Sequence, residues 1–251
     1  MKSRLGALLL CVSSALCASS GLGCAGLGMG PDEAPVPSSV RALALLPLRV
    51  PDTLGLDPAA EARVQSEIDA AIESELRRRG YDVVPAETFQ QIETRLRDAA
   101  GIPAGVDTSE LPEGALGARI EAVGDHSFRE LLFRHPTDWL LRGELIVVQI
   151  RTQSNYASWD GAYLEIPSQN SALRDLLLPF AGTVRGVTLR LAAINRSRQP
   201  VLLNLAGLEL IEIREGGDLK PIPPDELLRD PERLSDALER ALTRFTRSDG
   251  G

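Results

Sequence analysis

Cysteine and histidine are scarce: the 251-residue chain has three cysteines and two histidines. His126 and His135 lack the spacing of a zinc motif and have no cysteine partner, so we expect no metal site and no cofactor. The nucleophile elbow G-x-S-x-G and the phosphate-binding loop are also missing, and we assign no catalytic residue. Cys11 and Cys17 fall in an apolar N-terminal segment. A chain without this segment would keep only Cys24 and could form no internal disulfide.

Aromatic residues and positive charge are also in short supply. Aromatic residues make up 4% of the chain, and the formal net charge is -8. Nucleic-acid binding needs a basic surface, so this balance argues against a nucleic-acid partner, and it also argues against binding anionic membranes by charge alone. With 43% hydrophobic residues, the chain can bury a substantial core.

The N-terminus has the pattern of an export signal. Lys2 and Arg4 precede an apolar run, residues 5–18, which is too short to cross a bilayer as a helix. Small residues then lead to Cys24. This stretch resembles a bacterial lipoprotein signal, in which the cysteine becomes the acylated first residue of the mature chain. The resemblance implies lipidation at Cys24 and attachment to a membrane through that lipid.

An alternative remains open at this junction. Ordinary signal-peptidase cleavage after residues 18–20 would give an exported protein without a lipid, and Gly21 stands where lipoprotein signals usually have leucine. On the lipoprotein reading, residues 1–23 are the signal peptide, residues 24–39 are a tether rich in Gly, Pro, Ala and Ser, and residues 40–247 are the domain. By the same resemblance, Ala25 after the cysteine favours the outer membrane, with the domain in the periplasm.

A strand, a helix and a second strand are predicted at the start of this domain. Residues 42–50 form an apolar run, residues 57–79 an amphipathic segment, and residues 81–84 a second apolar run. Asp57 is a good N-cap, and Gly80 can end the helix in a left-handed conformation. The expected buried positions, spaced four apart, are Val64, Ile68, Ile72 and Leu76.

The remaining chain predicts a mixed sheet flanked by helices, that is, a single α/β (α+β) domain without internal repeats. Asp160-Gly161 predicts a hairpin. The expected helices are residues 85–101, 115–123 and 127–134, a short helix or turn at 171–178, and a last helix from 224 or 225 with Leu228, Leu234, Leu238, Leu242 and Phe245 buried. The expected strands are residues 138–150, 156–159, 162–166, 187–193 and 201–213. Arg142 and Gly143 are expected to be structural.

Three of the few aromatic residues gather near the predicted hairpin. Tyr156, Trp159 and Tyr163 lie within eight residues of each other. Tyrosine and tryptophan are favoured contact residues at interfaces, so these three form a candidate partner-binding edge. The simpler interpretation is that they pack across the hairpin on one another.

Three stretches carry a resemblance to a group of bacterial envelope proteins. They are residues 45–48 (LLPL), 75–84 (ELRRRGYDVV) and 137–143 (TDWLLRG). The chain resembles the amino-terminal domain of the Tol-system propeller protein, the curli secretion lipoprotein and the lipoprotein activators of penicillin-binding proteins. The resemblance implies a common α/β domain and offers no shared catalytic residues.

These observations favour a non-catalytic, lipid-anchored accessory or assembly lipoprotein that docks on a larger protein complex of the bacterial cell envelope. Three alternatives stay open. The first is an oligomeric secretion-channel subunit. The second is an auxiliary lipoprotein of a lipid transporter, which would need an apolar groove. The third is an envelope hydrolase with a carboxylate pair, for which the acids include Glu209, Glu212 and Glu215.

Overall fold

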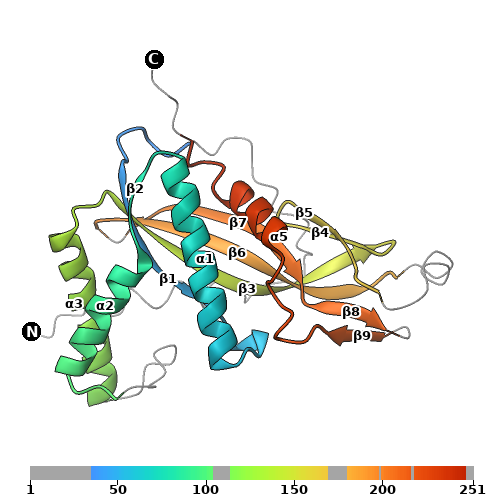
Figure 1. The fold of residues 1–251 in the computed structure, drawn as a ribbon, viewed down its shortest axis with the longest axis horizontal. Helices are drawn as coiled ribbons and strands as arrows, with labels where there is room; N and C mark the ends of the chain where they lie inside the picture. The colour runs from blue at the N-terminus through green and yellow to red at the C-terminus, as the bar shows by residue number, and fades with distance from the viewer. Residues whose placement is uncertain (1–34, 104–113, 169–179, 198, 216–217, 247–251) are drawn as a thin grey trace, which may run out of the picture. The chain divides into compact units, whose positions relative to one another are not determined.

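The computed structural model describes residues 35–103, 114–168, 180–197, 199–215 and 218–246, and it shows a mixed α/β domain (Figure 1). The main sheet runs in the order β2-β1-β3-β6-β7, and β4 and β5 continue from the end of β3. Strand β1 is parallel to β2 and β3, whereas the other pairs are antiparallel. The strands are β1 (Ala42–Arg49), β2 (Asp82–Val84), β3 (Trp139–Gln153), β4 (Tyr156–Trp159), β5 (Ala162–Glu165), β6 (Thr183–Asn195) and β7 (Pro200–Leu210). A separate hairpin consists of β8 (Glu212–Glu215) and β9 (Asp218–Pro221).

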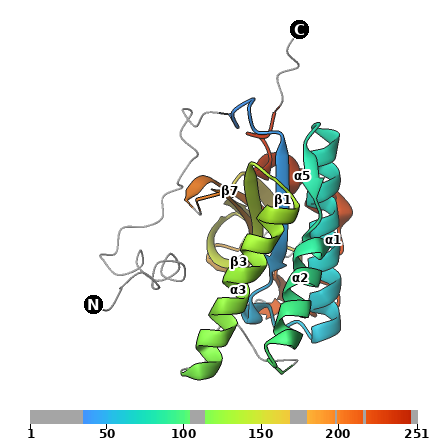
Figure 2. The same ribbon diagram turned by 90° about the vertical axis from the view of Figure 1, so that its left-hand side faces the viewer.

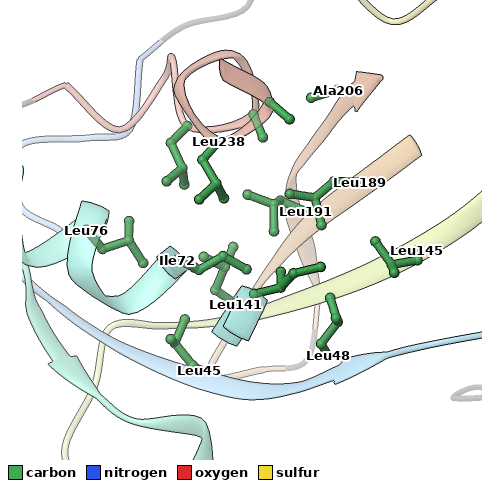
Figure 3. Packing of buried hydrophobic residues seen from close by; sticks show 14 of the residues in the cluster. Leu45, Leu48, Ile72, Leu76, Leu141, Leu145, Leu189, Leu191, Ala206 and Leu238 are labelled. Carbon is green, nitrogen blue, oxygen red and sulfur yellow. The ribbon is translucent and has the colours of Figure 1, made fainter. Parts of the chain in front are cut away.

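Helices α1 (Pro58–Arg78) and α5 (Pro231–Ala241) cover one face of the sheet, in front of the strands in Figure 1. The Asp57 side chain accepts a hydrogen bond from the Ala60 backbone N–H at 2.8 Å, which caps α1 as the sequence predicts. The four predicted α1 positions are buried against the sheet. Figure 3 shows Ile72, Leu76 and Leu238 from these helices among strand leucines.

Helices α2 (Ala86–Ala99) and α3 (Ala115–Arg134) pack together at the β1 end of the sheet (Figure 2). A second hydrophobic cluster lies on the opposite sheet face. The helices contribute Phe89 and Ile92 of α2 and Phe128 and Leu131 of α3. The strand residues of this cluster are Ala44, Leu46, Leu140 and Ile194. The sheet is therefore covered on both faces near β1.

The β4–β5 hairpin folds back over the sheet face that α2 and α3 cover, at the end far from these helices. Its tip is clamped to the sheet: Gly207 N–H donates to the Asp160 carbonyl at 3.0 Å, and the Thr188 hydroxyl donates to the Asp160 carboxylate at 2.7 Å. Asp160 and Gly161 both have positive φ, 42° and 76°, as a two-residue hairpin turn requires. The hairpin predicted from Asp-Gly is thus confirmed.

Several element boundaries differ from those expected. The two short helices at 115–123 and 127–134 form one continuous helix, because Gly124 lies inside it and a single glycine costs only about 1 kcal/mol. The last helix begins at Pro231 rather than 224 or 225, since Asp230 caps it by accepting from the Glu232 and Arg233 N–H groups. The strand expected at 201–213 breaks at Ile211. The short helix or turn expected at 171–178 lies outside the described residues.

Packing also begins earlier than residue 40. Val36 and Val40 are both 5% exposed and belong to the main core. The Val36 N–H donates to the Arg244 carbonyl at 2.9 Å, which joins the two ends of the described chain. Residues from Val36 on therefore contribute to the domain.

Candidate functional site

Two of the three hairpin aromatics form an exposed pair. The rings of Tyr156 and Tyr163 stack with 5.0 Å between centroids and 9° between planes. Tyr163 lies opposite Ser158, so the two tyrosines are diagonal neighbours on the outer face of the hairpin. The residues are 37% and 67% exposed. The two rings therefore pack on one another, as the simpler interpretation predicts, and both residues are exposed, while partner binding at this pair stays a prediction.

The side chain of Trp159 lies on the opposite face of the hairpin from the two tyrosines, so the three aromatic residues do not form one surface. Side chains alternate along a strand, and Trp159 faces the sheet rather than the solvent side. Its ring lies over Gly186 and Gly207, where a Cβ atom would come within 3.1 Å and 2.8 Å of it. Its buried indole N–H has no hydrogen-bond partner among the described residues. Trp159 thus anchors the hairpin and is not part of the exposed edge.

The three glutamates considered for a hydrolase do not converge. Glu212 pairs with Arg185 at 2.8 Å, Glu215 pairs with Lys220 at 2.6 Å, and Glu209 pairs with Arg233 at 3.3 Å. Each carboxylate therefore has its own cation.

Of these three glutamates, only Glu209 is buried, and it lines a very small cavity. Burial raises the pKa of Glu209, and this effect is opposed by the Leu228 N–H, which donates to it at 2.6 Å, and by Arg233. Arg233 also contacts Asp230 at 3.0 Å. The cavity measures about 10 Å³, which is room for roughly one water molecule and not for a sugar ring. These contacts fasten the segment before α5 to the sheet.

Asp69 of α1 is a second partly buried acid. Its carboxylate accepts a hydrogen bond from the Leu48 N–H at 3.1 Å. Burial raises the pKa of Asp69 to about 6, against the effect of this hydrogen bond. The residue joins α1 to β1.

Gly143 is structural, as expected, because a Cβ atom there would come within 2.7 Å of the Leu48 side chain. Among the described residues, no group of three or more His, Cys, Asp or Glu side chains could hold a metal ion. In the same part of the chain, no helix combines the length and the apolar character needed to cross a membrane. Cys24 and the signal region lie outside the described residues.

Comparison with known proteins gives only distant structural likeness. No protein family model and no curated protein matches the chain. The chain is similar to lipoprotein GNA1162 from Neisseria meningitidis at 14% identity, covering 67% of this chain and 81% of that one with a TM-score of 0.31. It is also similar to a putative neuraminyllactose-binding hemagglutinin homolog from Helicobacter pylori at 10% identity, covering 87% and 90% with a TM-score of 0.34. Neither likeness carries an argument about function.

Sequence reasoning missed a group of charged residues on the sheet. Arg142 was expected to be structural, yet its side chain is exposed, and strand pairing brings it near Arg49 and Arg190. These three arginines come from three different strands. Their only signal in the sequence is a charged residue inside an otherwise apolar strand, which does not reveal its neighbours.

Proposed function

We propose that this protein is a lipid-anchored lipoprotein of the bacterial cell envelope that works by binding a protein partner and not by catalysis. In this proposal Cys24 carries the lipid, residues 25–35 tether the domain, and the domain faces the periplasm, with the outer membrane as the more suitable site. The leader pattern, Lys2 and Arg4 before an apolar run and a cysteine, supports the anchor. Two or more acyl chains give stable attachment at about 0.8 kcal/mol for each buried methylene.

The exposed tyrosine pair is the observation that carries the binding role. Tyr156 and Tyr163 offer a large, amphipathic contact surface with few rotatable bonds. The hydrogen bonds of Asp160 and the partly buried ring of Trp159 hold the hairpin on the sheet, so little ordering is needed on binding. A preformed aromatic platform of this kind suits docking to a larger protein.

The anchor is tested by following fatty-acid labelling and membrane fractionation of the wild type, Cys24→Ala and Cys17→Ala in a bacterial host. We expect label in the wild type and in Cys17→Ala, and loss of both label and membrane attachment in Cys24→Ala. Cys17→Ala is the matched control because that cysteine lies inside the leader. An unlabelled wild-type protein would refute the anchor and favour ordinary cleavage after residues 18–20.

The binding surface is tested by replacing Tyr163 with a photoreactive amino acid in the cell. We expect an ultraviolet-dependent adduct of defined mass, which Tyr156→Ser weakens because it removes the stacked neighbour. The same photoreactive group in place of Arg129 serves as the control, because the Arg129 side chain on α3 is 76% exposed. Equal adducts at both positions, or none at Tyr163, would refute this role for the tyrosine pair.

A further inference from the structure

On the sheet face opposite α1 and α5, described elements pack over both ends, and the part between them contains the exposed residues Arg49, Arg142 and Leu203. Helices α2 and α3 cover Leu46, Leu140 and Ile194 at one end. The β4–β5 hairpin covers the other end, where Trp159 meets Gly186 and Gly207. The residues between form what we call the bare strip: Arg49, Arg142, Glu144, Arg190, Ala192, Leu203 and Leu205.

Strand register sets the charged residues of the bare strip side by side. Arg49 of β1 is opposite Glu144 of β3, and Glu144 is opposite Arg190 of β6. Arg142 lies two residues before Glu144 on the same face of β3, because side chains alternate along a strand. Three arginines thus occupy positions next to Glu144, and Arg190 forms an ion pair with its carboxylate.

This charge is only partly neutralised within the described residues. Glu144 pairs with Arg190, and it is the one carboxylate there that forms an ion pair with any of the three arginines. Protein atoms around the Arg142 guanidinium lower its pKa, as does the charge of Arg49, while Glu93 of α2 raises it. Burial and Arg49 likewise lower the pKa of Arg190. Arginine nonetheless stays protonated, so the strip keeps a local positive charge in a chain of net charge -8.

An exposed apolar edge lies beside this charge. Leu203 of β7 is 53% exposed, and the neighbouring Val201 is 41% exposed. Leu203 is opposite Ala192 on β6, which in turn is opposite Arg142 on β3. Among the described residues, β7 pairs only with β6, so its outer edge carries no further strand.

We propose that the bare strip binds a short, extended, acidic segment of a partner protein, with carboxylates at Arg49, Arg142 and Arg190 and an apolar side chain against Leu203. Arginine matches carboxylates with a planar, two-donor geometry. The four strands span roughly 14 Å, which an extended segment of about four or five residues crosses. Elements packed on a sheet stand roughly 10 Å above it, so α3 and the hairpin keep a flat membrane away from the strip but admit a single chain.

This inference depends on neither the tyrosine pair nor the lipid anchor. The test uses the full-length protein in phosphatidylcholine vesicles. The probe is a short fluorescein-labelled peptide with the sequence Ser-Glu-Ser-Glu-Ser-Leu. Fluorescence anisotropy gives the Kd, and empty vesicles correct for partitioning of the peptide. A second peptide has lysine in place of glutamate.

We expect saturable binding of the acidic peptide and none of the basic one. Arg142→Glu and Arg49→Glu should each raise the Kd about tenfold, because each places a carboxylate opposite the ligand's carboxylates. Leu203→Ser should raise it about fivefold through lost apolar contact. Arg129→Glu on α3, outside the strip, should leave the Kd unchanged.

Other results would overturn the proposal. One is binding of the basic peptide with similar affinity, and another is an acidic-peptide Kd that does not change in Arg142→Glu. Equal competition by inorganic phosphate would reduce the strip to a general anion site, and transfer of the protein to anionic vesicles through the same arginines would assign it to lipid. Circular dichroism of each variant separates a changed surface from a changed fold.

Discussion

At the scale of single residues, two partly or fully buried acids of this domain join separate elements through hydrogen bonds. Glu209 accepts from Leu228 N–H and holds Arg233, and Asp69 accepts from Leu48 N–H. Each joins two elements that are distant in the chain. A buried carboxylate stabilises such a junction best when its hydrogen bonds compensate for lost solvation.

Asp69 should therefore make stability depend on pH. Its pKa is raised from 3.8 to about 6. Between pH 4 and pH 6 the carboxyl group of Asp69 is therefore protonated in the folded protein and ionised in the unfolded chain. The stabilisation is complete below about pH 4 and is lost as pH rises through 6. Allowing for partial exposure, the loss is about 1–2 kcal/mol.

Urea unfolding of wild type and Asp69→Asn between pH 4 and 7 measures this effect, because asparagine can still accept from Leu48 without ionising. We expect a smaller change of unfolding free energy with pH in Asp69→Asn. Asp236→Asn, on the exposed side of α5, is the matched control and should follow the wild type. Parallel pH profiles for Asp69→Asn and the wild type would contradict the assignment.

At the scale of elements, the attachment of the hairpin depends on two glycines. A Cβ atom at Gly207 would lie 2.7 Å from the Trp159 carbonyl oxygen and 2.7 Å from the Ala162 Cβ. The first of these is backbone and cannot rotate away. Close approach of hairpin and sheet is thus possible only because these sheet positions lack side chains.

Gly207→Ala should destabilise the protein by about 1–3 kcal/mol and loosen the hairpin, because overpacking must push Trp159 outward. Gly124→Ala in α3 is the matched control: nothing lies within 4 Å of its added Cβ, and alanine should stabilise that helix by about 0.5–1 kcal/mol. Thermal unfolding reports both changes in stability, and the tryptophan fluorescence maximum, measured in a Trp139→Phe background, reports the surroundings of Trp159. A Gly207→Ala protein with wild-type stability and emission would show that the hairpin is not held in this way.

The same scale shows what the sequence could predict. Helix α1 was predicted closely because its signals are local: an N-cap at Asp57, apolar positions four apart and Gly80 at the end. The start of α5 was wrong because Pro224 and Pro231 both suit a first helical turn, and only the Asp230 hydrogen bonds decide between them. The bare strip could not be predicted, since Arg49, Glu144 and Arg190 meet only through the pairing of β1, β3 and β6.

At the scale of the whole molecule, the two ends of the described chain meet in the main core. Phe245 is fully buried, and its ring meets that of Tyr81 edge-to-face at 5.8 Å. Val36 and Val40 join the same core, and Val36 is hydrogen-bonded to Arg244. The residues that precede the first strand therefore help to close the domain.

Removing residues 1–34 should leave the stability of the domain nearly unchanged, whereas removing residues 1–40 should lower Tm by roughly 10 °C. The second truncation loses two buried valines, each worth about 1.5–3 kcal/mol, and 1 kcal/mol corresponds to about 2–4 °C in a chain of this size. In the full-length protein, Val36→Ser should lower Tm, whereas Val201→Ser, at a 41% exposed position, should change it little. Calorimetry of the wild type, the two truncations and the two point variants measures these differences. Equal Tm values for the two truncations would mean that the segment from Val36 to Val40 adds nothing to the core, and the domain would then begin with β1.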